Sequence, residues 1–284
     1  MESLSVAVTR GGVVESIHRV HAVAVRAGSV VAAAGDPERV LFLRSAWKPI
    51  QAVPLAEGYD DLSDAELAIA CASHQAEPAQ LEAVRALLAR AGATADDLEN
   101  GPQVGRPEGK LGHNCSGKHA GMLAACRAHG WPLEGYRLAE HPLQRRVVDV
   151  LDAPTLGSAI DGCGVPTYAL TLRDAAGVLL QTRPRIAAAM RARPELVGGT
   201  GADDTALMRA LPGWIAKRGA EGLICAAAPD GTGIALKVED GNQRALRPAL
   251  GAFLERLGVR DPGFGPVPLV NSRGEAVGRV AVAA

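Results

Sequence analysis

The chain has 284 residues, which is enough for one large domain or two small ones. Hydrophobic residues make up 48% of it and charged residues 21%, so we expect a sizeable core. A net charge of −1 and an aromatic content of 3% argue against a nucleic-acid partner or an anionic membrane surface. No stretch approaches the roughly 20 apolar residues that a membrane-spanning helix needs.

The N-terminus has no basic flank followed by an apolar run, so the sequence predicts no signal peptide. Five cysteines, an odd number, are spread widely along the chain. Without an export signal, they are expected to be thiols or metal ligands rather than a disulfide framework. These features predict a cytoplasmic protein.

Both ends of the chain have the pattern of strands. Short apolar or alternating runs at 6–8, 22–25, 30–33 and 40–43 are separated by glycines. After Gly219, strands are again predicted at 223–227, 234–238 and 277–282, with an amphipathic helix at 245–257 and a loop at 261–268.

The middle of the chain is predicted to be helical. Ser63 and Glu66 form a capping box, Pro78 suits a first helical position, and Gly130 suits a helix end. The other predicted helices lie at 81–91, 116–130, 141–151, 184–193 and 203–210. We therefore predict an α+β fold in a single domain, residues 1–284. An antiparallel sheet from about 1–43 and 219–284 packs against a helical region of about 45–212.

A first candidate site is Ser45-x-x-Lys48, which follows a predicted strand and opens a predicted helix. Positions i and i+3 share a helix face, so the lysine is placed to activate the serine hydroxyl as a nucleophile. This requires burial or a nearby cation to keep the amine neutral. The alternative is that Ser45 only caps the helix, because this spacing is common.

A second candidate is the segment 72–77, where Ser73, His74 and Glu77 lie in a predicted loop. The alternative is that Ser73 and Glu77 cap the next helix. Lys237, on a predicted strand, is a further candidate because a second cation would depress the pKa of a neighbouring lysine. Its alternative is a solvated lysine on the surface.

The densest group of reactive side chains is Cys115-Ser116-Gly117-Lys118-His119, at a predicted helix start. Cys163 lies in a glycine-rich turn elsewhere. Two thiolates, Lys118 and a water would make an open zinc site. The spacing matches no common zinc pattern, and the alternative is that each cysteine is a small buried hydrophobe, which suits Cys71, Cys126 and Cys225 better.

Seven of these segments, in this order, resemble the L-asparaginase family with a serine-β-lactamase-like fold, the third structural class of L-asparaginases. The resemblance covers nearly the whole chain. The segments are 10–18, 44–51, 72–78, 114–123, 161–166, 199–208 and 233–241.

The resemblance implies a fold like that of serine β-lactamases and glutaminases, a homodimer, and hydrolysis of L-asparagine to L-aspartate and ammonia. It implies two serine–lysine pairs, Ser45 with Lys48 and Ser73 with Lys237. It also implies a zinc-type metal, whose identity the sequence leaves open, held by a set of residues matching Cys115, Lys118 and Cys163.

We expect Ser45 to be the nucleophile, Lys48 its base, and Ser73 with Lys237 a proton relay. The metal is expected to orient the substrate rather than to attack it. A zwitterionic substrate needs a cation and an anion, and the candidate substrate-binding residues are Arg44, Asp161 and His119.

The chain departs from the family pattern at three positions. The family usually has glycine at Ala76, histidine at Gln80 and arginine at Ala202. These changes bear on substrate affinity and preference more than on reaction type. Two other functions are kept open: a β-lactamase- or peptidase-like serine hydrolase, and a zinc- or redox-sensing protein without catalysis.

Overall fold

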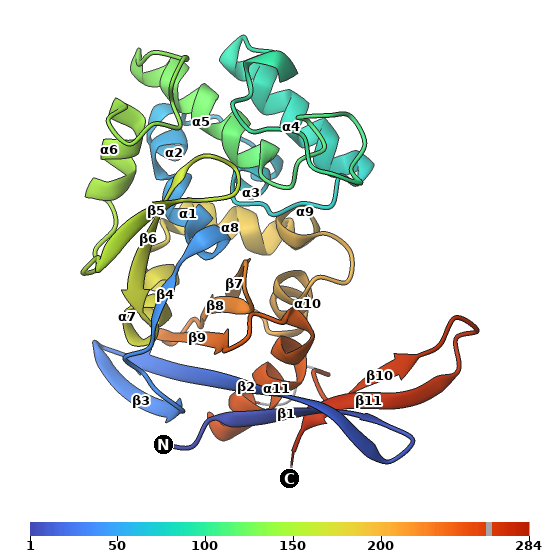
Figure 1. Cartoon of the computed structure of the whole chain (residues 1–284). Coiled ribbons are helices and arrows are strands. Elements are labelled where there is room, and N and C mark those ends of the chain that lie inside the picture. The colour runs from blue at the N-terminus through green and yellow to red at the C-terminus, as the bar shows by residue number, and fades with distance from the viewer. Residues whose placement is uncertain (260–262, 284) are drawn as a thin grey trace.

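An antiparallel sheet built from both ends of the chain carries a helical region on one side (Figure 1). The computed structural model describes residues 1–259 and 263–283. From edge to edge the strands are β10 (Val267–Val270), β11 (Ala276–Val282), β1 (Leu4–Arg10), β2 (Val13–Arg26), β9 (Thr232–Val238), β8 (Leu223–Ala227) and β7 (Ile215–Gly219). A further strand, β3 (Ser29–Ala34), pairs with β2. The predicted fold class is confirmed.

The helical region contains most of the helices. They are α1 (Lys48–Gln51), α2 (Val53–Gly58), α3 (Asp64–Ala70), α4 (Pro78–Ala91), α5 (Ser116–His129), α6 (Pro142–Asp149), α7 (Leu172–Val178), α8 (Pro184–Ala192), α9 (Pro194–Gly198) and α10 (Asp203–Ala210). The last helix, α11 (Leu246–Arg256), packs on the sheet near its C-terminal strands. Short 3₁₀ turns are η1 (Arg44–Trp47), η2 (Ala95–Asp97), η3 (Leu179–Gln181) and η4 (Gln243–Ala245). None of the described helices combines the length and apolar character that a membrane crossing requires.

Local sequence signals explain several of these boundaries. The Ser63 hydroxyl accepts a bond from the Glu66 backbone N–H, and the Glu66 carboxylate accepts one from the Ser63 N–H, so α3 begins with the predicted capping box. Gly92 and Gly130 end α4 and α5 in the left-handed conformation, with φ of 62° and 67°.

Three expectations about the sheet need correction. Residues 40–42 form β4 (Val40–Phe42), which joins a separate small sheet with β6 (Pro166–Thr171) and β5 (Gly157–Ile160) instead of the main sheet. The returning strands begin with β7 before Gly219, not after it. The predicted loop 261–268 lies partly outside the described residues, and its end belongs to β10.

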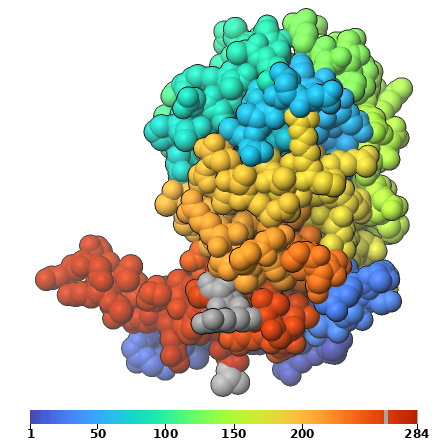
Figure 2. All heavy atoms as spheres, turned by 180° about the vertical axis from the view of Figure 1, so that it is seen from behind, coloured from blue at the N-terminus to red at the C-terminus, as the bar shows by residue number. Residues whose placement is uncertain are grey.

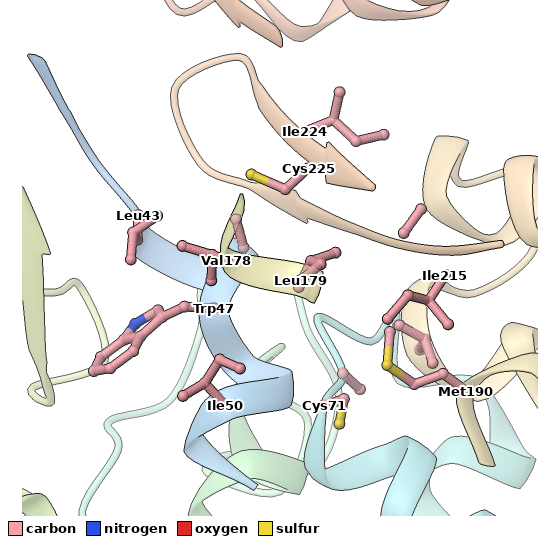
Figure 3. Close-up of a cluster of buried hydrophobic side chains, with 14 of the residues drawn as sticks. Leu43, Trp47, Ile50, Cys71, Val178, Leu179, Met190, Ile215, Ile224 and Cys225 are labelled. Atoms are coloured by element: carbon pink, nitrogen blue, oxygen red, sulfur yellow. The ribbon is translucent and has the colours of Figure 1, made fainter. Parts of the chain in front are cut away.

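The main core lies between the sheet and the first helices. Val178 and Leu179 lie at the centre of this layer, between Trp47 and Ile50 of η1 and α1 and Cys225 of β8 (Figure 3). The Trp47 ring also meets the Tyr168 ring edge to face, with centroids 5.4 Å apart. This packing fixes the segment Arg44–Trp47 against the β7 edge of the sheet.

The two hairpins at the far end of the sheet extend beyond this core. The β10–β11 hairpin projects from the body of the molecule (Figure 2). In β2, residues 20–25 are buried on both faces, whereas residues 13–17 are largely exposed. The sheet is therefore covered on both sides only where it meets the helices.

Glycine 117 allows α5 to approach α3 closely. A Cβ atom there would lie 2.3 Å from the Ile69 carbonyl oxygen. We predict that Gly117→Ala lowers the free energy of unfolding by about 1–3 kcal/mol through overpacking. Gly177→Ala in α7 is the matched control, because nothing lies within 4 Å of its added methyl group. It should raise stability by about 0.5–1 kcal/mol. Urea denaturation of both variants measures this, and changes of the same sign would contradict the packing argument.

Candidate active site

Lys48 is the centre of the candidate site. Its side chain is fully buried, and its ammonium group donates to Ala72 O at 2.5 Å, Ser73 Oγ at 3.1 Å and Cys115 Sγ at 3.2 Å. An ammonium has three N–H donors, and these contacts use all of them. One lysine thereby joins three of the predicted segments: the start of α1, the loop after α3 and the start of α5.

Ser45 and Ser73 line the same polar pocket, which has a volume of about 370 Å³. Its walls also carry two guanidinium groups, Arg106 and Arg218, and the side chain of Asn114. The Lys48 ammonium donates to the Ser73 hydroxyl, whereas Lys48 bonds to Ser45 only through its backbone N–H, which donates to Ser45 O. The pocket brings two serines and two arginines together, and the buried Lys48 lies behind Ser73, a set suited to an anionic substrate with an electrophilic carbonyl.

Arg44, immediately before Ser45, has a φ of 48°, in the left-handed region. For a long side chain this conformation is unfavourable and persists only when the surroundings impose it. The Arg44 N–H donates to Thr167 Oγ1 at 3.0 Å and its Nε to Asp161 Oδ1 at 2.5 Å. These bonds hold the turn that presents Ser45 to the pocket.

Arg44 and Asp161 therefore bind each other in the structure. Burial alone would raise the pKa of Asp161, but Lys118, Arg44 and the Gly162 N–H outweigh it and lower the pKa. Neither residue lines the 370 Å³ pocket. Binding of a zwitterion through them would require this ion pair to exchange partners.

The two predicted metal-ligating cysteines come together. The Lys118 ammonium lies 2.9 Å from Cys163 Sγ, and the Lys48 ammonium lies 3.2 Å from Cys115 Sγ. The neighbouring Cys163 side chain, with the charges of Lys48 and Lys118, holds the pKa of Cys115 well below its ordinary value despite burial. Burial lowers the pKa of Lys118, but the two sulfur atoms outweigh it and the pKa is raised.

His119 is fully buried behind this group and does not reach the pocket. Burial lowers its pKa to about 4, so the ring is neutral. The Tyr136 hydroxyl accepts from the Glu99 N–H at 2.8 Å and lies 2.7 Å from His119 Nδ1, to which it donates. The ring proton is then on Nε2, which interacts with the Cys163 side chain without a hydrogen bond of normal geometry.

The donor set fits a metal ion that accepts sulfur and nitrogen. Among the described residues, no group of three His, Cys, Asp or Glu side chains is arranged to hold a metal. Cys115 and Cys163 are adjacent, however, and the third donor is the amine of Lys118. A cation-bound sulfur at Cys163 would also accept the proton of the buried His119 Nε2, which has no normal partner among the described residues. Two thiolates and an amine suit Zn²⁺ or a similar borderline ion.

The structure does not bring Lys237 to Ser73. Its ammonium donates to Glu221 O at 2.5 Å and Val238 O at 2.6 Å, and β9 is two strands away from the β7 edge. The strand that borders η1 is β7, which carries Lys217.

Lys217 is fully buried and was missed by the sequence reasoning. Burial lowers its pKa to about 8; the charge of Lys48 adds to this shift, and Asp204 partly opposes it. The available signal was the apolar run before it, Trp214 to Ala216, which is typical of a buried strand.

His74 connects the two loops of the site. Its Nδ1 accepts from the Ala76 N–H at 3.1 Å, so the ring proton is on Nε2 and donates to Ser116 Oγ at 2.8 Å. Ser116 in turn donates to Leu111 O at 2.6 Å. This directed chain fixes the loop that carries Ser73 to the start of α5.

Two of the departures from the family pattern have a structural explanation. Ala76 has a φ of 62°, a conformation that glycine adopts without cost. Gln80 is buried; its oxygen accepts from the N–H groups of Gln75 and Glu77, and its amide donates to Glu195 O. It thus supplies one acceptor and one donor, as a neutral histidine does. Ala202 is buried at the start of α10, and nothing in the structure explains its loss of arginine.

Comparison with known proteins gives a family. Residues 6–282 match the model of the family described as L-asparaginase II. No curated protein matches the chain. Among solved structures, a β-lactamase from Mycobacterium bovis is 14% identical, with a TM-score of 0.38 over 84% of this chain and 94% of that one. A putative β-lactamase from Bacteroides dorei is also 14% identical, with a TM-score of 0.39 over 83% and 93%.

The burial of neutral His74 predicts a loss of stability in acid. Burial first, and the charges of Lys48 and Arg106 next, lower its pKa from 6.5 to about 3. Below about pH 6.5 the unfolded chain binds a proton that the folded chain does not, so the free energy of unfolding falls as pH drops from 6.5 towards 3. Between pH 7 and pH 5 this amounts to about 2 kcal/mol.

The variant His74→Gln tests this assignment. It retains a donor and an acceptor but cannot be protonated, so we expect lower stability at pH 7, by about 1 kcal/mol, and a smaller fall between pH 7 and pH 5. Urea denaturation at both pH values measures the two differences. A fall as steep as that of the wild type would show that His74 is not the titrating group.

Proposed function

The chain belongs to the L-asparaginase II family, and we propose that it hydrolyses the side-chain amide of L-asparagine to L-aspartate and ammonia through an acyl-enzyme. The observation that carries the proposal is the fully buried Lys48, bonded to Ser73 in the pocket that Ser45 also lines. A serine and a base within hydrogen-bonding reach are what amide hydrolysis without a histidine requires.

In this proposal Ser45 is the nucleophile. It follows the strained turn at Arg44 and lies in the first turn of η1. The Lys48 ammonium donates to Ser73 Oγ at 3.1 Å, so Lys48 must lose a proton before it can act as a base. Ser73 then receives the proton of Ser45 and passes it to the Lys48 amine. Lys48 returns this proton through Ser73 to the departing –NH2 group, which leaves as ammonia when the C–N bond breaks. A water molecule then cleaves the ester on Ser45 and releases L-aspartate.

Binding of the substrate is assigned to the cations of the pocket. Arg106 and Arg218 line it, and a guanidinium binds a carboxylate through two parallel hydrogen bonds. We therefore assign the α-carboxylate of the substrate to these two residues. Arg44 and Asp161 form an ion pair with each other in the structure. They can bind the charged groups of the substrate only after this ion pair has separated.

The metal is part of the proposal as well. Cys115, Cys163 and Lys118 would hold it, and a bound Zn²⁺ supplies a Lewis acid that can polarise or orient a substrate oxygen. Since Lys118 is protonated without the ion, binding must displace a proton from it. The homodimer and the cytoplasmic location stay predictions.

Ammonia release from L-asparagine and L-glutamine by the purified protein is the direct test. We expect release from L-asparagine, and a loss of at least about 100-fold in Ser45→Ala, Ser73→Ala and Lys48→Met. Hydroxylamine added during turnover should give aspartyl hydroxamate, because it traps the acyl group. Loss of activity in Ser73→Ala with normal turnover in Ser45→Ala would transfer the nucleophile to Ser73. No ammonia from a folded wild-type protein would contradict the proposed function and leave two alternatives, the β-lactamase- or peptidase-like hydrolase and the non-catalytic sensor.

Equilibrium dialysis against Zn²⁺ tests the metal site without any assay of activity. We expect about one bound ion per wild-type chain, and a strong loss in Cys163→Ser and Lys118→Met. Cys126→Ser is the matched control, because this buried cysteine lies on the same helix as Lys118 and outside the donor set. It should bind Zn²⁺ like the wild type. Equal binding by Cys163→Ser would contradict the assignment.

A further inference from the structure

Arg106 brings to the pocket a positive charge that no carboxylate compensates. Its guanidinium lines the pocket beside His74 and has no hydrogen-bond or ion-pair partner among the residues that the structure describes. Arg218 differs, because its Nε lies 3.6 Å from Asp204 Oδ1 and its Nη1 donates to Gln243 Oε1 at 3.5 Å. Of the two guanidiniums, Arg218 therefore has partners within the protein and Arg106 is available to a ligand.

The loop that carries Arg106 is fixed at several points. The Arg106 N–H donates to Gln103 O at 3.1 Å, and Gln103 Oε1 accepts from the Asn114 N–H at 2.9 Å. A Cβ atom on Gly112 would lie 1.8 Å from the Pro107 carbonyl oxygen, so the loop folds closely on itself. These contacts hold the backbone of Arg106 beside the start of α5, and its place at the pocket wall follows from the fold.

The charges of this wall do not match those of L-asparagine. None of the described residues that line the pocket is an aspartate or a glutamate, and its neutral polar groups include the amides of Gln75, Asn114 and Gln243. L-Asparagine carries one carboxylate and one ammonium group, and a single guanidinium can bind both oxygens of a carboxylate. A second guanidinium then has no acidic group of the ligand to bind. Charge complementarity therefore favours a ligand with a second carboxylate.

Arg106 lies on the side of the pocket where the leaving group departs. In the proposed function Ser73 passes the returning proton to the leaving nitrogen, and Ser73 precedes His74 in the same loop. The charge of Arg106 acts on His74, whereas Arg218 belongs to strand β7. A second carboxylate that binds Arg106 is therefore expected on the amine part of the substrate rather than on its acyl part.

We infer that the site also hydrolyses amides of the L-aspartate side chain whose amine part carries its own carboxylate, which are β-aspartyl dipeptides. With such a substrate Arg218 binds the α-carboxylate of the aspartyl part, and Arg106 binds the carboxylate of the second amino acid. This inference rests on the proposed function and names a further substrate class for the same site. The pocket volume of about 370 Å³ lies in the range of about 300–1,000 Å³ that is typical of pockets for ligands of this size.

The reaction needs no group beyond those already proposed. The Ser45 oxygen forms a bond to the side-chain carbonyl carbon, and the bond between this carbon and the amide nitrogen breaks. The nitrogen takes the proton that left Ser45, by way of Ser73, and departs as the amine of the second amino acid. A water molecule then cleaves the ester, giving its hydroxyl to the acyl carbon and its proton to Ser45 Oγ.

The experiment compares the release of L-aspartate from L-asparagine, β-aspartyl-glycine and the β-propylamide of L-aspartate. The propylamide has a leaving group of similar size without the carboxylate. We expect kcat/KM for β-aspartyl-glycine to exceed that for the propylamide by at least about tenfold, the effect of one charge-assisted contact. In Arg106→Gln this ratio should fall to about one. Arg106→Lys keeps the charge but not the paired donors, and should restore part of the ratio.

Lys110→Gln is the matched control, because Lys110 lies in the same loop, donates to Asp96 O at 2.8 Å and does not line the pocket. It should keep the wild-type ratio. A merely structural Arg106 would lower the turnover of all three substrates and leave the ratio in place, which would overturn the inference. Release of L-aspartate from L-asparagine but not from β-aspartyl-glycine would overturn it as well, and would leave the proposed function intact.

Binding without turnover separates this inference from the proposed function. In Ser45→Ala, which lacks the proposed nucleophile, titration calorimetry should show β-aspartyl-glycine bound at least about tenfold more tightly than the propylamide. Adding Arg106→Gln to this variant should remove the difference. The same preference, in a protein whose wild type releases no ammonia from L-asparagine, would contradict the proposed function and support the assignment of Arg106. Equal binding of the two ligands to Ser45→Ala would overturn the inference.

Discussion

A buried ammonium group is the constraint on which the rest of the site depends. An uncompensated charge in the interior of a protein is so unfavourable that the group must either find partners or lose its proton. Lys48 has no exposed surface, and its partners come from the loop after α3 and the start of α5. The hydrogen bonds of the Lys48 ammonium therefore hold these two loops beside α1. As a result, the two serines line one pocket.

The same requirement extends outward as an alternating series of charges. On one side, Cys115 and Cys163 separate Lys48 from Lys118, and Asp161 separates Lys118 from Arg44. On the other side, Asp204 compensates Lys217 and Arg218. Every cation in the series has a sulfur or a carboxylate beside it. The arrangement spans the boundary between the helical region and the sheet, and its stability therefore depends on both layers packing correctly.

Local sequence signals predicted much of the fold but only part of the site. Caps, prolines and glycines are contacts between near neighbours, so the boundaries of α3, α4 and α5 were predictable. The grouping of Cys115, Lys118 and Cys163 came from the family resemblance, and the structure places these side chains together. The partner of Lys217 depends on which strand forms the edge of the sheet. That choice is a long-range pairing that no local pattern specifies.

Lys237 shows why the sequence alone could not identify Lys217 as the buried lysine of the site. It lies on a strand of suitable composition, and both lysines belong to the same sheet. One strand, β8, lies between β9 and β7, and neighbouring strands are about 4.8 Å apart, so the displacement is about 10 Å. The Lys237 ammonium donates to Glu221 O and Val238 O instead, although composition and spacing along the chain look equally good for both lysines. Only the strand order distinguishes them.

Cys115 connects the two halves of the site. Its sulfur accepts from Lys48 at 3.2 Å, and the neighbouring Cys163 side chain lowers its pKa, so it belongs both to the serine–lysine group and to the thiol–amine group. A thiol is a weak acceptor, whereas a thiolate attracts an ammonium strongly. The protonation of Cys115 therefore affects how firmly Lys48 is held beside Ser73. A substitution at either cysteine should therefore change the position of the Lys48 ammonium relative to Ser73. The two groups are best regarded as one electrostatic unit in which the sulfur of Cys115 is the common atom.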